Sequence, residues 1–223
     1  MRFDSEQPAS ATPPQPAPAL PPWEERHRYG FFNALYLTIR EVLTTPDRFF
    51  SRMPLRSDLW QPLLFAVTVV VIGAFLIWMW TLTAFSPLRA IFHLHREMAH
   101  RTAVAFASGG FFVMSPVIAV AAVFAQAAIV HLCLMLLDAG RAGFEATFRG
   151  VAYAHAVYVL AAIPFCGDLI ALFWGAAITV VAIRRLHGAE TWRAVLAVTL
   201  PLLLCLSSCG GVALLGTVRR LLD

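Results

Sequence analysis

The sequence lacks several features that would mark a soluble or secreted protein. It contains no lysine, and its basic residues are all arginine, so the net charge of +4 gives no indication of nucleic-acid binding. Charged residues make up only 13% of the chain, against about 25% in soluble domains. The four cysteines form no C-x-x-C pair and lie in or beside apolar runs, which argues against a disulfide framework or a zinc ribbon. We therefore expect no cofactor.

The sequence is instead rich in long apolar runs. Hydrophobic residues make up 59% of the 223 positions, and the mean hydropathy is +0.71, values typical of a polytopic membrane protein. Five apolar runs are predicted to cross the membrane as helices, and the first, residues 62–85, is long enough for a hydrocarbon core of about 30 Å. We predict an all-α integral membrane protein whose five transmembrane helices lie near residues 62–85, 111–137, 146–163, 168–183 and 192–215.

Composition divides the chain into three parts. Residues 1–22 are rich in proline and alanine and have no apolar run of signal-peptide length, so we expect a disordered tail. Residues 23–60 are expected to form one or two amphipathic helices at the cytoplasmic face or the membrane interface. Residues 61–218 would then hold the five-helix membrane domain.

The segment before the first span carries two helix signals. Apolar residues recur at helical spacing over 29–43, and Thr45 before Pro46 is a good cap and first turn for a second short helix. Two placements remain open, since both helices can lie in the membrane interface or pack on the domain's own cytoplasmic face. In the first placement the partners are anionic lipids, met by Arg40, Arg48, Arg52 and Arg56.

Turn residues and arginines set the order and direction of the spans. We expect the glycines at 109–110 to separate the second span from a polar stretch at 86–102, and Pro164 with Gly167 to form a tight turn between the third and fourth spans. With the N-terminus inside, twelve arginines lie on the cytoplasmic side and five outside. The N-terminus is therefore predicted to be cytoplasmic and the C-terminus external.

The histidine-rich segment "HLHREMAH" at 93–100 resembles a zinc-protease motif only superficially. The two histidines of H-E-x-x-H lie at i and i+4 on one helical face, whereas His95 and His100 are five residues apart and Glu97 is displaced. Cys205 and Cys209, one helical turn apart, lack the further ligands of a metal site. No catalytic residues are predicted, and we expect a protein that is not an enzyme.

Polar residues inside the predicted spans are the first candidates for function. Gln126, His131 and His155 lie within apolar runs, where polar groups are costly and often functional. They can line a path for a proton or a ligand, or they can make hydrogen bonds that hold the helices together. The sequence leaves both alternatives open.

A second candidate is the charged entry to the third span. Glu145 and Arg149 are four residues apart in the favoured order for a helical ion pair, and Tyr153 lies one turn deeper on the same face. We expect an ion pair at the cytoplasmic interface, to which the Arg149 side chain can extend. The alternative is an inner gate.

Several segments together resemble the bacterial type of the Yip domain family, the Ypt/Rab-interacting proteins. They are "PWEER", "PDRFF", "GFEATFRGVAYA", the spacing of Pro164, Gly167 and Trp174, and "LHGAETWRAVLAV", in an order that covers residues 22–215. The resemblance implies five transmembrane helices and a cytosolic N-terminus. Eukaryotic relatives bind prenylated small GTPases and membrane-curving partners in secretory trafficking, a role that does not transfer directly to a bacterial chain.

Three classes of function remain. We expect a membrane-organising or partner-recruiting scaffold of the bacterial inner membrane, with an unknown protein partner and with a homo-oligomer left open. The alternative is a small transporter or channel with a polar path at Gln126, His131 and His155. An intramembrane enzyme using His95, Glu97 and His100 is the weakest hypothesis.

Overall fold

The computed structural model describes residues 20–54, 58–83, 98–201 and 203, with side chains omitted for 98–108. This part of the chain is helical. Its elements are α1 (Arg26–Tyr29), α2 (Phe31–Thr44), α3 (Pro46–Ser51), α4 (Trp60–Thr83), α6 (Met98–Leu136), α7 (Gly143–Ala154), the 3₁₀ helix η1 (His155–Ala162) and α8 (Gly167–His187). Helix also covers residues 191–201.

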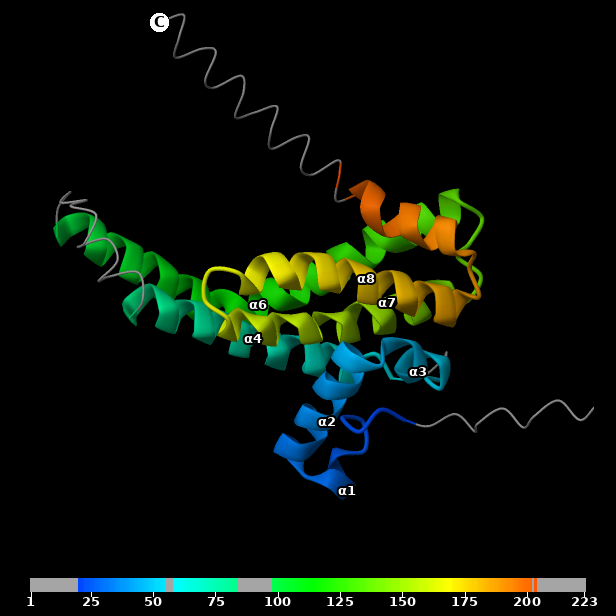
Figure 1. Cartoon of the computed structure of the whole chain (residues 1–223), viewed down its shortest axis with the longest axis horizontal. Helices are drawn as coiled ribbons and strands as arrows, with labels where there is room; N and C mark the ends of the chain where they lie inside the picture. Colours follow the sequence, from blue (N-terminus) through cyan, green and yellow to red (C-terminus); the bar gives the residue numbers. More distant parts are fainter. Residues whose placement is uncertain (1–19, 55–57, 84–97, 202, 204–223) are drawn as a thin grey trace, which may run out of the picture.

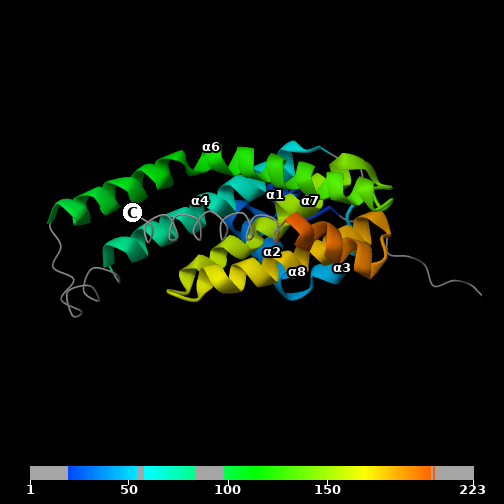
Figure 2. The ribbon, with the colours of Figure 1, turned by 90° about the horizontal axis from the view of Figure 1, so that it is seen from above.

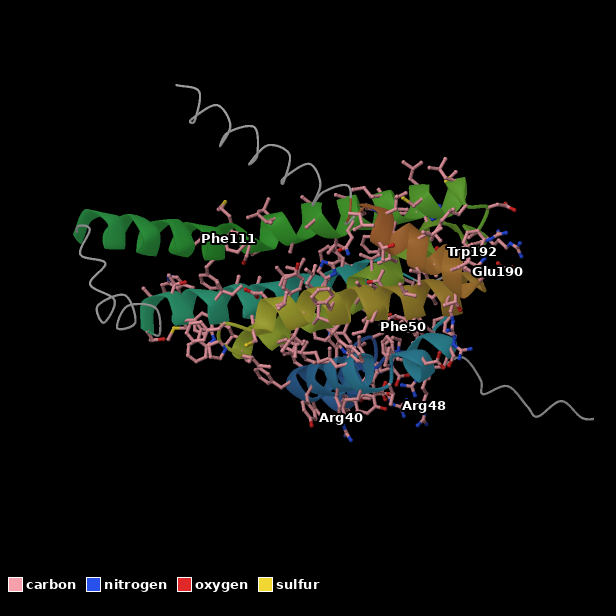
Figure 3. All side chains as sticks on the ribbon, turned by 45° about the horizontal axis from the view of Figure 1, so that its top comes forward. Arg40, Arg48, Phe50, Phe111, Glu190 and Trp192 are labelled. Atoms are coloured by element: carbon pink, nitrogen blue, oxygen red, sulfur yellow. The ribbon has the colours of Figure 1, made fainter. Side chains whose placement is uncertain are left out.

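The long helices run side by side along the longest axis of the molecule (Figures 1 and 2). Helix α4 packs against α6 and η1, and α8 packs against α7, η1 and α3. Helices α1, α2 and α3 lie together on one side of this bundle (Figure 1). Phe111 lies toward the end where α6 begins, whereas Glu190 and Trp192 lie at the opposite end (Figure 3).

Three described helices are long and apolar enough to cross a membrane, namely α4, the Gly109–Leu136 part of α6, and α8. The prediction of an all-helical membrane protein is therefore confirmed, with three candidate membrane-spanning helices in the described part of the chain. The predicted fifth span begins as helix at residue 191, and its part beyond 203 lies outside the described residues, as do 1–19 of the predicted tail.

The predicted third span changes helix type halfway. The backbone N–H of His155 bonds to Ala152 O instead of continuing the α-helical pattern, and this starts the 3₁₀ segment. The carbonyl of Val151 then accepts a hydrogen bond from His155 Nδ1 at 2.8 Å. The imidazole thus satisfies a carbonyl that the helix end would leave without a partner.

The predicted break at the glycine pair is wrong, because α6 continues from Met98 through Gly109 and Gly110 to Leu136. Neither glycine has a positive φ, and a Cβ added at Gly110 would meet no atom within 4 Å. A glycine inside a helix costs only about 1 kcal/mol relative to alanine, too little to stop a long apolar helix that packs on α4. Residues 98–102 of the polar stretch are helical, and 86–97 lie outside the described residues.

The turn predicted between the third and fourth spans is present. Phe165 has a φ of 68°, and the N–H of Gly167 donates to Ile163 O at 3.0 Å. A Cβ on Gly167 would lie 2.1 Å from the backbone oxygen of Leu160. The close approach of η1 to the start of α8 therefore requires glycine at this position.

We predict that Gly167→Ala destabilises the protein by about 1–3 kcal/mol or more, because a backbone oxygen cannot move aside as a flexible side chain would. Gly110→Ala is the matched control, with open space around the added methyl group, and is expected to be neutral or slightly stabilising. Thermal unfolding of both variants in the same detergent measures the difference, and equal melting temperatures would contradict the close approach of η1 to α8 at this turn.

Candidate functional site

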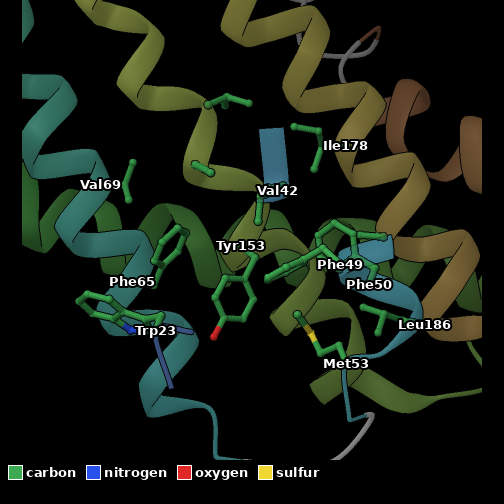
Figure 4. Close-up of a cluster of buried hydrophobic side chains, with 14 of the residues drawn as sticks. Trp23, Val42, Phe49, Phe50, Met53, Phe65, Val69, Tyr153, Ile178 and Leu186 are labelled. Atoms are coloured by element: carbon green, nitrogen blue, oxygen red, sulfur yellow. The ribbon is translucent and has the colours of Figure 1, made fainter. Parts of the chain in front are cut away.

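The segment around Trp23 fastens the N-terminal region to the bundle. The Trp23 side chain is fully buried, with Phe31 and Phe65 packed edge-on at 5.3 and 5.8 Å between ring centroids. Its backbone N–H donates to Thr38 Oγ1 and its indole N–H to Gln61 O, both at 2.9 Å. These contacts hold the segment between α2 and the start of α4, and Figure 4 shows Trp23 beside Phe65.

The next residue, Glu24, makes the most buried charged contact of the described chain. Its Oε1 accepts hydrogen bonds from Arg149 Nη2 at 2.6 Å and from the Tyr153 hydroxyl at 2.7 Å. Arg149 Nη1 also donates to the backbone oxygen of Asp58 at 3.2 Å. The Glu24 side chain is 4% exposed, and those of Arg149 and Tyr153 are 0% exposed. We call Glu24, Arg149 and Tyr153 the buried latch.

Aromatic packing surrounds the buried latch. The Tyr153 ring lies between Phe49 of α3 and Phe65 of α4, with centroids at 5.3 and 5.1 Å (Figure 4). Two charges in such surroundings contribute little net stability compared with apolar residues of similar volume. Removing one of them is costly, because the other is left buried without a counter-charge. The buried latch therefore specifies that the N-terminal segment packs against α7. Its contribution to the net stability is small.

The prediction that Arg149 pairs with Glu145 at the lipid–water interface is wrong. Arg149 is buried beneath the N-terminal segment, and its salt bridge is to Glu24, 125 residues away in sequence. Glu145 lies half-buried in the first turn of α7. The spacing rule for helices considers only partners within one helix, so it misses Glu24, even though "PWEER" is one of the family-like segments of the sequence.

Helices α2 and α3 are held against α8 by contacts at the helix ends. The Trp174 indole N–H donates to Leu43 O at 3.2 Å. Asp47 accepts two hydrogen bonds from Arg185 at 2.5 and 2.6 Å and lies 3.8 Å from Arg184. The hydrogen bond from Arg185 is the main reason that the pKa of Asp47 lies below its usual value.

The core side of α3 is buried against the rest of the domain. Phe49, Phe50 and Met53 are buried in the main hydrophobic cluster of the bundle. Helix α3 therefore packs on the domain itself. Among the four arginines proposed to meet lipid, Arg52 pairs with Glu41, Arg40 and Arg48 are exposed, and Arg56 lies outside the described residues.

His131 belongs to a hydrogen-bonded chain that joins α6, α7 and α8. The backbone N–H of Ala142 donates to His187 Nδ1 at 3.2 Å, so the proton of the neutral ring is assigned to Nε2. Nε2–H then donates to Thr147 Oγ1, and the Thr147 hydroxyl donates to His131 Nδ1, both at 2.9 Å. Of the two alternatives for His131, a path or an interhelical hydrogen bond, the structure contains the hydrogen bond. Its partners in this chain, Thr147 and His187, could not be identified from the apolar pattern of the sequence.

Gln126 and His155 line one cavity of about 610 Å³ between α6, η1, α8 and residues 191–201. His131 is not among its lining residues. The proposed polar path is thus divided, with two members in the cavity and the third in the separate hydrogen-bonded chain. Asp168, Tyr158 and Thr179 also line the cavity and were not singled out from the sequence.

The candidates of the enzyme hypothesis and the separate cysteine pair fall mostly outside the described residues. These are His95, Glu97, Cys205 and Cys209, and His100 is described only by its backbone in α6. Within the described part of the chain, no group of three or more His, Cys, Asp or Glu side chains is placed to hold a metal ion.

We predict that Glu24→Gln lowers the free energy of unfolding by about 3–5 kcal/mol, because Arg149 stays buried without its counter-charge. Glu25→Gln is the neighbouring control. It removes a partly exposed pair with Arg28 at 3.4 Å, which is worth less than about 1 kcal/mol. Chemical or thermal unfolding in one detergent compares the two.

A double-mutant cycle isolates the interaction. Combining Glu24→Gln with Arg149→Met removes both charges, and we expect it to recover much of the stability lost in either single variant. If the two single effects simply add, the carboxylate and the guanidinium do not interact and the buried latch is not formed.

The comparisons with known proteins place this architecture in a family. Searches of curated proteins and of solved structures find no match. The Yip1 domain, in contrast, matches residues 40–212, a segment that includes Arg149 and Tyr153 but not Trp23 or Glu24. Because the match covers more than half of the chain, this membrane protein belongs to the Yip1 domain family.

Proposed function

We propose that the protein is a non-enzymatic membrane scaffold that recruits a partner or organises anionic lipid through the outer face of α2. The observation that carries this proposal is the two-sided character of that helix. Its inner face is fixed on the bundle, with Ala34 and Val42 fully buried. On its outer face Phe32 is 83% and Tyr36 61% exposed, and Arg40 continues the same stripe one turn further on.

Exposed aromatic side chains beside arginine suit a binding surface. Aromatic rings supply apolar area at low entropic cost and arginine supplies charge-assisted hydrogen bonds, a combination enriched at interfaces and at the polar boundary of bilayers. Arg40 and Arg48 extend away from the bundle (Figure 3). Since Arg52 is engaged by Glu41, we assign the contact with anionic groups to Arg40 and Arg48.

The outer face of α2 is held in a fixed orientation relative to the bundle. This supports a recruitment surface more than a flexible linker. The buried latch joins Glu24 to α7, Trp174 holds the end of α2, and Asp47 binds α8 through Arg185. These contacts come from two helices of the bundle, α7 and α8. A partner bound on α2 would therefore be positioned relative to the membrane domain.

The proposal includes five spans with the N-terminus in the cytoplasm. At about 1.5 Å per residue in α7 and about 2.0 Å in η1, the two together extend about 34 Å, enough to cross a hydrocarbon core. The loop after α6 and the loop after α8 lie at the same end of the bundle (Figure 1). Arg141, Arg184, Arg185 and Arg193 gather near these loops, which supports a cytoplasmic assignment for that end.

Reporter fusions test this topology. Fusions after residues 60, 141 and 188 are expected to report from the cytoplasm, and fusions after 100 and 223 from the opposite side. The physical reason is the arginine excess in the first group of segments. A cytoplasmic signal from the fusion after 223 would contradict the five-span arrangement.

Site-specific photo-crosslinking tests the recruitment surface. A photoreactive residue at Tyr36, on the outer face of α2, is expected to give defined adducts with one protein or with anionic lipid in native membranes. The combined Arg40→Glu and Arg48→Glu substitutions should reduce these adducts several-fold, since they reverse the charge that meets the partner.

Phe173 is the control position, because it is 67% exposed and lies on a different helix, α8. Crosslinks there should be to bulk lipid and insensitive to the charge reversal. If Tyr36 gives the same adducts as Phe173, with the same insensitivity, α2 is not a recruitment surface.

A second candidate is transport, favoured by one observation. The cavity lined by Gln126 and His155 lies within the bundle of membrane-spanning helices. In this candidate the polar side chains form part of a path across the membrane.

A further inference from the structure

The cavity beside η1 has the size and lining of a ligand site. Its volume of about 610 Å³ falls within the range of about 300–1,000 Å³ typical of small-molecule pockets. Most of its lining side chains are apolar, and the polar ones are few. Residues Asp168 and Thr179 of α8 both line it, so at 1.5 Å per residue it extends about 17 Å along that helix.

His155 presents an unused polar atom to this cavity. Its side chain is 5% exposed and lines the cavity. Nδ1 is occupied by Val151 O, so in the neutral ring the proton lies on Nδ1 and Nε2 is a hydrogen-bond acceptor. Within the described chain Nε2 has no hydrogen-bond partner. Nε2 can therefore accept a hydrogen bond from a donor bound in the cavity.

Gln126 adds a second polar group at the cavity wall. It lies in the apolar part of α6, where an amide without partners is unfavourable in a bilayer. In the part of the chain that the structure describes, its amide has no hydrogen-bond partner. Gln126 and His155 therefore offer hydrogen bonds to a polar group of a ligand lying along the cavity.

Asp168 gives the cavity its charge. Among the described lining residues it is the one with a charge, and no salt bridge to it is found in the described chain. The start of α8 compensates part of this charge. Because no arginine is among the described lining residues, the described wall of the cavity favours a cation and disfavours a phosphate group, which argues against a phospholipid.

We propose that this cavity binds a single-chain amphiphile with a cationic amine, whose ammonium group lies at Asp168 and whose chain passes Gln126 and His155 toward Thr179. The inference goes beyond the scaffold proposal and does not depend on it. A site of this kind would also give the transport candidate a substrate class, an apolar amine.

Binding of matched dodecyl compounds to the full chain in nanodiscs tests the site. Radiolabelled dodecylamine is expected to bind saturably above the signal of empty nanodiscs, and dodecanol more weakly. Asp168→Asn should weaken dodecylamine binding at least tenfold while leaving dodecanol unchanged, because only the amine uses the carboxylate. Asp138→Asn, at an exposed acid outside the cavity lining, is the control and should bind both compounds as the parent chain does.

A second variant covers the apolar part of the cavity. Leu172→Trp adds volume at a partly exposed wall position, so it should fold normally and weaken the binding of both compounds.

Absence of saturable dodecylamine binding, or unchanged binding in Asp168→Asn, would overturn the proposal. Neither result concerns the α2 surface, and the charge reversal at Arg40 and Arg48 should leave amine binding intact. Flux of bound dodecylamine across vesicles would favour the transport candidate over the scaffold.

Discussion

The charge of Arg149 is the constraint on which the rest of the structure depends. It sits on the buried face of α7, with its side chain 0% exposed, where an unpaired guanidinium would be very unfavourable. The described chain provides one carboxylate for it, that of Glu24. To reach Arg149, the segment before α1 must enter the bundle, and Trp23 then fills the space between α2 and α4. The position of α2 follows from this docking.

Polar groups inside the bundle fall into two kinds that differ in how fully they are satisfied. In the chain from Ala142 through His187 and Thr147 to His131, successive hydrogen bonds connect α6, α7 and α8. Such a network specifies which helices are neighbours. The groups at the cavity differ, since His155 uses one ring nitrogen to complete the end of α7 and keeps the other toward the cavity. The nitrogen that lies toward the cavity remains available to the ligand proposed there.

Features that depend on local composition could be predicted from the sequence. Apolar length located α4, the main part of α6 and α8, because burial in lipid depends mostly on composition over about 20 residues. The predicted break at the glycine pair was wrong, because the low helix propensity of glycine is a small effect compared with the packing of α6 on α4. The turn at Gly167 was predictable because proline and glycine act locally.

Partners distant in sequence could not be predicted by local rules. Helical spacing placed Arg149 correctly on the third span but assigned it the nearest carboxylate in sequence, whereas the fold brings Glu24 from 125 residues away. The sequence identifies His131 as a polar group in an apolar helix, yet Thr147 and His187 become its partners only when three helices meet. The switch to a 3₁₀ helix at His155 likewise depends on a side chain competing for a backbone carbonyl.

The buried latch also bears on what forms a folding unit in this chain. The Yip1 domain match begins at residue 40, but Arg149, inside the matched segment, takes its counter-charge from Glu24, outside it. Phe65, also inside the match, packs on Trp23. The matched segment alone would therefore leave a buried charge without a partner and an aromatic surface uncovered. For this protein the stable unit therefore includes the segment of Trp23 and Glu24, where Pro21 and Pro22 are also buried, and the helix proposed to recruit a partner is part of that unit.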